Sequence, residues 1–200
     1  GKSVNKSENI KRKFVMKNII KLGLTLALYA AVSCALLAVV NNWTSPKIEA
    51  LKAAKTAEGL KIVLQDADSF QDVTADFPTK VGTTEINGVY AGYKNEEGCG
   101  VVIKATGATY DKSTILIGID INGKCSGIVF LECSDSPGFG QKAADPNYVT
   151  SKGTTFYGQF TGLDFARSPR MGKDFEAISG ATITSRGVET IIDDALSILK

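Results

Sequence analysis

The sequence predicts an α+β fold in which a single N-terminal transmembrane helix precedes an extracytoplasmic domain, with an antiparallel sheet packed by helices. Three observations support this prediction. An uncharged apolar run covers Leu22 to Val40, four later segments are rich in β-branched and aromatic residues, and the C-terminus carries an amphipathic helical pattern. A chain of 200 residues accommodates one domain of ordinary size and such an appendage.

The apolar run has the length of a membrane span. Its roughly 19 residues are close to the ~20 that an α-helix needs to cross the core of a bilayer. Lys21 can snorkel at one end, and Trp43 suits the interface at the other. We therefore expect a basic tail over residues 1–13, a transmembrane helix over 14–42 and a helical connector over 43–65, in which Pro46 begins a new helix at its first turn.

Positive charge gathers before the span and predicts its orientation. Lysine and arginine dominate that flank, where Glu8 is the single acid. The positive-inside rule then places the N-terminus in the cytoplasm and residues 66–200 outside the cell membrane. A cleaved signal peptide, a lipoprotein signal at Cys34 and a buried soluble helix are the alternatives. The run is longer than a signal-peptide core, stays apolar beyond Cys34 and is apolar on all sides, which favours an uncleaved anchor.

Four strands are expected in the external domain, after a polar loop over Asp66–Thr83. They cover Ile86–Tyr93, Gly100–Ala105, Thr114–Ile121 and Lys124–Cys133. Asn122-Gly123, between the last two, is a strong hairpin signal. Isoleucines at alternate positions of the third strand predict one apolar face and one open face. An amphipathic helix over Arg186–Leu199 is the natural cover for the apolar face.

Composition excludes several kinds of function. The chain has no histidine, which removes Ser-His-Asp hydrolysis and histidine-ligated haem or metal sites. A net charge of +2 with 22% charged residues gives no nucleic-acid signature. The four cysteines form no Cys-x-x-Cys pair, and Cys125 and Cys133 are too far apart along one strand to bridge each other. Neither a metal site nor a nucleic-acid partner is expected.

The turn before the C-terminal helix is rich in glycine and hydroxyl groups: Ser179-Gly180-Ala181-Thr182-Ile183-Thr184-Ser185. A helix N-terminus offers free N–H groups and the positive end of a dipole, which suit a phosphate. Gly180 lets a ligand approach the backbone closely, and the hydroxyls can donate to phosphate oxygens. The same residues also fit an ordinary helix N-cap at Thr184 or Ser185.

The segment from Glu176 to Ser185 resembles the flavinylation motif of the FMN-binding domain family. In that family a flavin transferase joins FMN, through its phosphate, to the threonine that closes the pattern Asp-x-x-Ser/Thr-Gly-Ala-Thr. The resemblance implies a covalent FMN phosphoester on Thr182, with Glu176 in place of the usual aspartate. The further residues that it implies around the cofactor are Ser179, Gly180, Ala181, Thr184 and Ser185.

Thr106-Gly107-Ala108-Thr109 repeats the core of this motif. Ile103 occupies its acidic position, and a strand-like run rather than an amphipathic helix follows it. We expect a loop between strands at this point, with Thr109 unmodified.

A second segment, Glu132 to Gln141, carries Pro-Gly followed by another glycine. That composition predicts a tight surface turn and is also typical of an ordinary connector. The segment resembles the Glu-x-x-Glu/Asp-Thr-Pro-Gly-Leu-Gly loop of the same family, which lies near the flavin. The resemblance implies that Ser136, Gly138 and Phe139 lie near FMN, with Phe139 beside the isoalloxazine. For Glu132 and Asp135, exposure to solvent is an equally good expectation.

The order of anchor, connector, Pro-Gly loop and motif resembles the RnfG family, which belongs to Rnf complexes, the ion-translocating ferredoxin:NAD⁺ oxidoreductases. The resemblance implies a membrane-anchored electron-transfer subunit that carries covalent FMN, without complete activity or catalytic side chains of its own. Its implied partners are the other membrane and peripheral subunits, and a flavin transferase for maturation. Two other interpretations stay open: the related FMN-carrying subunit of a Na⁺-translocating NADH:quinone reductase, and a non-redox assembly module anchored in the membrane.

Overall fold

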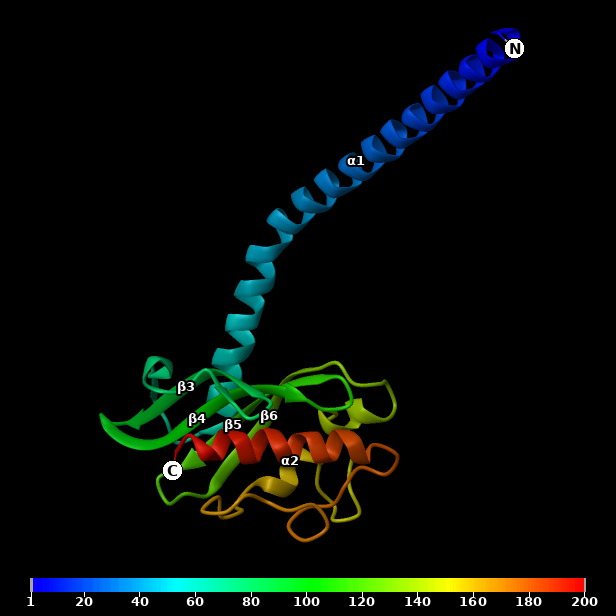
Figure 1. Cartoon of the computed structure of the whole chain (residues 1–200). Helices are drawn as coiled ribbons and strands as arrows, with labels where there is room; N and C mark the ends of the chain where they lie inside the picture. Colours follow the sequence, from blue (N-terminus) through cyan, green and yellow to red (C-terminus); the bar gives the residue numbers. More distant parts are fainter. Residues whose placement is uncertain (1, 200) are drawn as a thin grey trace. The chain divides into compact units, whose positions relative to one another are not determined.

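The computed structural model describes residues 2–199, with side chains from residue 16 onward. The chain divides into two compact units, which meet between Ala53 and Ala54. The first unit belongs to helix α1 (Lys2–Val63), which continues into the second unit. The second unit contains the sheet and the C-terminal helix α2 (Thr182–Ser197) (Figure 1).

Helix α1 is continuous, so the basic flank, the apolar run and the connector share one helix. Its stretch Met16–Val63 is long and apolar enough to cross a membrane. The expectation that Pro46 begins a new helix is wrong, because Pro46 lies inside α1. Proline removes one backbone donor from the helix, but the good helix formers that follow it, such as Glu49, Ala50 and Leu51, favour its continuation.

The second unit is built on one antiparallel sheet with the strand order β1-β3-β4-β5-β6, and β2 pairs with β3. The strands are β1 (Ser69–Asp72), β2 (Lys80–Val81), β3 (Thr84–Lys94), β4 (Glu97–Ala108), β5 (Lys112–Asp120) and β6 (Cys125–Cys133). The four expected strands are confirmed as β3 to β6. The expected loop over Asp66–Thr83 is wrong in part, because it contains β1, β2 and the 3₁₀ helix η1 (Thr74–Asp76).

The β5–β6 hairpin turns at Asn122-Gly123, as the sequence predicts. Gly123 has φ +76°, a left-handed conformation that glycine adopts without strain. The Asp120 carboxylate accepts the backbone N–H groups of Asn122 and Lys124, both at 2.8 Å, and so closes the turn.

Both faces of the central strand β5 are buried, so the expectation of one open face is wrong. On one face, Ile115 and Ile117 belong to the core that α2 completes with Val188 and Ile192. On the other face, Leu116 packs with a separate cluster formed by Val102 of β4 and by Leu60, Val63 and Leu64 at the end of α1. The final turns of α1 therefore cover the face that strand periodicity left open (Figure 1).

The contact between α1 and the sheet requires a glycine in β5. A Cβ atom on Gly118 would lie 2.5 Å from the Val63 carbonyl oxygen. Ser126 of β6 donates its hydroxyl to the same oxygen at 2.5 Å. The end of α1 is thus fixed to the sheet by a backbone contact and not only by apolar packing.

The long segment between β6 and α2 has little regular structure beyond the 3₁₀ helices η2 (Gly140–Ala143) and η3 (Tyr157–Phe160). Three buried phenylalanines hold it against the core. The Phe156 ring meets those of Phe160 and Phe175 edge-on, with centroids 5.7 and 5.9 Å apart. Aromatic pairs of this kind contribute about 0.5–1.5 kcal/mol beyond the apolar area that they bury. This cluster fixes the chain shortly before the Ser179–Ser185 turn.

Candidate functional site

Thr182 is the first residue of α2, which begins four positions before the expected Arg186. Gly180 has φ +77° and makes the turn into the helix. The N-cap is Ala181, which provides no side-chain cap, so the expected cap at Thr184 or Ser185 is wrong. Because the first N–H groups of a helix have no partner within it, the turn at Thr182 presents donors to an incoming anion.

Thr184 and Ser185 do not cap the helix because both hydroxyls are used inside the protein. Thr184 Oγ1 donates to Asp135 at 2.5 Å. Ser185 Oγ accepts the Ile178 N–H at 2.9 Å and donates to the Ala181 carbonyl at 3.1 Å. Both residues are fully buried, whereas Thr182 is exposed. Thr182 is therefore the threonine of this helix turn whose side chain reaches solvent.

A pocket of about 440 Å³ lies beside Thr182. Its lining residues come from three segments: Tyr110; Ser136, Phe139 and Gly140; and Gly180, Ala181, Thr182, Ile183 and Thr184. The structure thus brings six of the predicted site residues together, from two motifs far apart in sequence. Phe139 and Gly180 are in close contact, since a Cβ atom on Gly180 would lie 3.2 Å from the Phe139 ring.

Sequence reasoning missed Tyr110 and Ile183, whose exposed side chains join Phe139 at the pocket. Ile183 lies within the motif, but a motif pattern does not single out its variable position. Tyr110 directly follows the second Thr-Gly-Ala-Thr segment, for which the sequence predicts only a loop between strands. The signal that identifies Tyr110 is the proximity of that loop to α2, and it depends on the tertiary fold.

Four predicted site residues do not line this pocket. Ser185 is buried behind it, Ser179 is exposed beside it, and Gly138 lines a neighbouring cavity of about 490 Å³. Glu176 accepts a hydrogen bond from the Ser151 hydroxyl at 2.5 Å. Its backbone is fixed on both sides by Gln159, through bonds of 2.9 and 3.2 Å.

Asp135 is buried, so the expectation that it is solvated is wrong. Its carboxylate accepts four hydrogen bonds. Two come from the hydroxyls of Thr109 and Thr184, at 2.6 and 2.5 Å, and two from the N–H groups of Asp111 and Tyr110, at 2.9 and 3.3 Å. Burial alone would raise the pKa of Asp135, but these four donors outweigh it and lower the pKa below 3.8. The carboxylate therefore stays charged inside the protein.

Thr109 follows β4 directly and lies in the turn before β5, as expected. Its side chain is buried, and its hydroxyl bonds with Asp135 and, at 3.2 Å, with Ser113. The two Thr-Gly-Ala-Thr segments are neighbours in space. A Cβ atom on Gly187 of α2 would lie 2.6 Å from both the Ala108 carbonyl oxygen and the Thr109 Cα.

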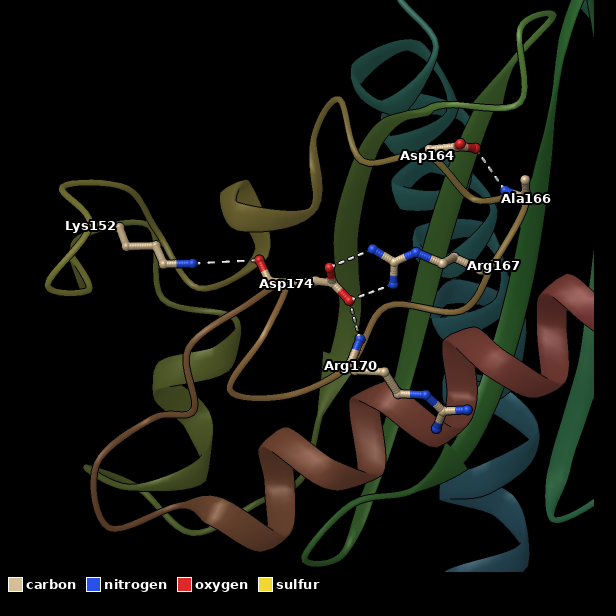
Figure 2. Close-up of polar contacts among 6 residues, drawn as sticks. All are labelled: Lys152, Asp164, Ala166, Arg167, Arg170 and Asp174. Carbon is tan, nitrogen blue, oxygen red and sulfur yellow. Dashed lines mark hydrogen bonds and ion pairs between the residues drawn. The ribbon is translucent and has the colours of Figure 1, made fainter.

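The loop that leads into the motif is held by charge. Figure 2 shows Arg167 pointing at Asp174, and the guanidinium donates two bonds of 2.8 Å to the carboxylate, which also accepts the Arg170 N–H at 2.8 Å. The hydrogen bonds from Arg167 and then from Arg170 hold the pKa of Asp174 well below its usual range. Lys152 reaches the Asp174 carbonyl at 3.5 Å (Figure 2). These contacts order the chain two residues before Glu176.

Two family models match the chain. The FMN-binding domain matches residues 109–197, which include the Pro-Gly loop, the pocket and all of α2. The RnfG N-terminal region matches residues 11–63, nearly the whole of α1.

Curated relatives match over almost their whole length. The subunit designated G in the ion-translocating oxidoreductase complex of Escherichia coli K12 is 30% identical, over 90% of this chain and 91% of the relative. The chain belongs to the RnfG family of ion-translocating oxidoreductase complexes. The corresponding subunit of the Na⁺-translocating ferredoxin:NAD⁺ oxidoreductase complex of Acetobacterium woodii is 28% identical, over 91% of this chain and 92% of the relative. That of the Methanosarcina acetivorans ion-translocating oxidoreductase complex is also 28% identical, over 90% and 94%.

Membership of this family agrees with the architecture. The candidate membrane span lies in α1, and the FMN-binding match begins at Thr109 and continues through α2. Within residues 2–199, no group of three or more histidine, cysteine, aspartate or glutamate residues is placed to hold a metal ion.

Proposed function

We propose that this chain is a membrane-anchored electron-transfer subunit of an ion-translocating ferredoxin:NAD⁺ oxidoreductase complex, and that it carries FMN on Thr182. The observation that carries the proposal is an exposed threonine hydroxyl at the first residue of α2, beside a pocket inside the segment that matches the FMN-binding domain. The names of its relatives, which all belong to ion-translocating oxidoreductase complexes of this type, favour this complex over the quinone reductase.

The residues present suit a flavin mononucleotide. The first-turn N–H groups of α2 and its dipole favour a phosphate at Thr182. Phe139, Ile183 and Tyr110 offer apolar surface for a flat ring, and more than half of each side chain is exposed. When bound, FMN supplies the one- and two-electron chemistry that amino-acid side chains lack. The share of this chain is to tether the cofactor, shape its surroundings and limit its contact with water.

Attachment needs an activated flavin and a free hydroxyl. Thr182 Oγ1 forms a P–O bond to the flavin phosphate while the pyrophosphate bond of a flavin dinucleotide breaks, the hydroxyl proton leaves and AMP is released. We assign this step to a separate flavin transferase. Glu176 faces Ser151 rather than the pocket, so we assign its carboxylate to recognition by that enzyme and not to contact with the bound flavin.

The structure also offers a matched control for the attachment site. Thr109 closes an identical Gly-Ala-Thr tripeptide, but its hydroxyl is buried and bonded to Asp135. After coexpression with a flavin transferase, the wild-type chain should fluoresce in a denaturing gel, with a mass gain of one FMN less one water. Thr182→Val should abolish both signals, and Thr109→Val should leave flavin on Thr182.

The relay itself is tested in the assembled complex. A complex with Thr182→Val should assemble but lose ferredoxin-dependent NAD⁺ reduction, while partial reactions with artificial acceptors survive at the other subunits. A complex that lacks flavin on this subunit and still couples the two substrates at the wild-type rate would favour the non-redox assembly module. Flavin mapped to Thr109 would disprove the assignment of the site.

A further inference from the structure

We propose that Asp135 is a positioning residue for flavin attachment: one buried carboxylate holds together the three segments that surround Thr182. This inference rests on the proposed function, because it concerns the same pocket. It assigns Asp135 no contact with the flavin, and its effect is transmitted through the residues that it bonds.

The carboxylate contacts, or directly precedes, every segment that lines the pocket. It accepts three hydrogen bonds from residues 109–111, the segment that contributes Tyr110. It accepts one from Thr184 in the first turn of α2, the segment that contributes Thr182. It also begins the third segment, because Ser136, Phe139 and Gly140 follow it within five residues. Asp135 is thus the common anchor of segments that are otherwise far apart in sequence.

The bond to Thr184 fixes how α2 presents Thr182. Successive helix residues are about 100° apart around the axis, so Thr184 and Thr182 point in nearly opposite directions. Once Thr184 is held inward on Asp135, Thr182 faces outward, and the two side chains are accordingly buried and exposed. Loss of the Thr184 bond would free the first turn, where a helix frays most easily.

The site demands a carboxylate rather than any polar side chain. All four partners of Asp135 are donors, and a carboxylate is an acceptor only, with two oxygens. An asparagine has one acceptor oxygen, and its amide group would direct N–H donors at two groups that also donate. Asp135→Asn therefore keeps the size of the side chain but turns half of its contacts into repulsive ones.

The neighbouring backbone leaves little room for adjustment. A Cβ atom on Gly140 would lie 2.5 Å from the Asp135 Cβ and 2.6 Å from Thr184 Oγ1. The Pro-Gly loop therefore packs directly on the Asp135–Thr184 bond. A displaced carboxylate would disturb the loop that carries Phe139 as well as the helix.

Asp194 provides a matched control, because it makes similar bonds at the other end of α2. It accepts the Thr84 hydroxyl at 2.7 Å and the Thr83 N–H at 3.3 Å, away from the pocket. If Asp135 acted only through stability, Asp135→Asn and Asp194→Asn would impair flavin attachment alike at equal loss of stability.

The experiment uses the full chain in detergent with a purified flavin transferase and FAD. The rate of flavin incorporation is followed by fluorescence in denaturing gels for the wild type, Asp135→Asn, Thr184→Val, Thr184→Ser and Asp194→Asn. Amide hydrogen exchange is measured on the flavin-free chains at Tyr110 and Asp111, whose N–H groups Asp135 accepts.

We expect Asp135→Asn to slow incorporation about tenfold or more, because small misplacements of a reacting group have effects of that size. Exchange at Tyr110 and Asp111 should become faster. Thr184→Val should also slow incorporation, Thr184→Ser should restore it because the hydroxyl is kept, and Asp194→Asn should stay near the wild-type rate.

Wild-type incorporation in Asp135→Asn, or equal slowing in Asp194→Asn, would overturn the inference while leaving the proposed function intact. If Asp135→Asn does not fold, Thr184→Val decides instead, and a wild-type rate in that variant overturns the inference. A wild-type chain that takes no flavin from an active transferase overturns the proposed function and the attachment role with it. Unchanged exchange at Tyr110 and Asp111 in Asp135→Asn overturns the anchoring role in either case.

Discussion

At the scale of single residues, the chain separates two copies of one short motif by burial. Thr109 and Thr182 both follow Gly-Ala, yet Thr109 is 8% exposed with its hydroxyl donated to Asp135, whereas Thr182 is exposed at the start of a helix. A transferase needs access to the hydroxyl that it modifies. The local sequence attracts the enzyme only where the fold leaves that hydroxyl free.

Gly140→Ala should destabilise the protein and slow flavin attachment. The new methyl group would overlap the Asp135 Cβ and Thr184 Oγ1, at 2.5 and 2.6 Å, and overpacking of this kind costs about 1–3 kcal/mol. Thermal unfolding of the full chain, followed by near-UV circular dichroism of its tyrosines, measures the loss. Gly98→Ala is the control, because no heavy atom lies within 4 Å of its added Cβ. Equal stability of the two variants would contradict the close contact.

Asp135 should also make stability depend on pH in a defined direction. Its pKa is lower in the folded protein than the ordinary 3.8, so it adds stability above that pH and loses it as the pH falls through the folded value. The difference in unfolding free energy between the wild type and Asp135→Asn should therefore be constant from neutral pH down to about pH 5 and shrink below pH 4. Unfolding curves across this range test the sign, and a difference that grows in acid would contradict it.

At the scale of elements, α2 has two tasks that its sequence assigns to different faces. Val188, Ile191 and Ile192 complete the core under the sheet, while the first turn presents Thr182 beside the pocket. Gly187 lies between these regions and lets the helix approach the turn after β4. The position of the helix along that turn therefore depends on a residue with no side chain.

Gly187→Ala should destabilise the protein, although alanine is normally favoured over glycine inside a helix by about 1 kcal/mol. The added Cβ would lie 2.6 Å from the backbone at Ala108 and Thr109, which cannot rotate away as a side-chain tip can. We expect a net loss of about 1–3 kcal/mol in thermal unfolding. Thr190→Ala, on the exposed side of α2, should be neutral or slightly stabilising. Stabilisation by Gly187→Ala would show that the helix can move away from the turn.

At the scale of the whole molecule, one continuous helix links the candidate membrane span to the sheet domain. Residues 54–63 of α1 belong to the second unit, and the residues before them belong to the first. The last turns of α1 are part of the core of the domain through Leu60 and Val63. A truncation after the span must therefore keep these turns, because their removal would expose Leu116 and Val102.

The orientation of the span is a prediction from its charged flank. Protease added to inverted membrane vesicles should leave residues 66–200 intact, and protease added to right-side-out vesicles should degrade them. Neutral replacements of Lys11, Arg12, Lys13 and Lys17 should weaken this preference, since cytoplasmic retention of positive charge sets it. A mature N-terminus near Cys34, or a lipid on that cysteine, would disprove the uncleaved anchor.

The sequence by itself determined the features that depend on neighbouring residues. The apolar run predicts the span in α1, β-branched runs predict β3 to β6, Asn122-Gly123 predicts the hairpin, and the motif points to Thr182. Each of these signals is local, because hydrogen-bonding periodicity and turn geometry act over a few residues.

Tertiary structure alone decided which polar groups are buried and what covers each face. Asp135 bonds to Thr109 and Thr184, which are 26 and 49 positions away, and no local pattern distinguishes it from a solvated acid. The second face of β5 is buried by the end of α1, although strand periodicity predicts it to be open. Burial depends on which distant segments meet, and those contacts set both the charge held behind the pocket and the threonine that remains exposed.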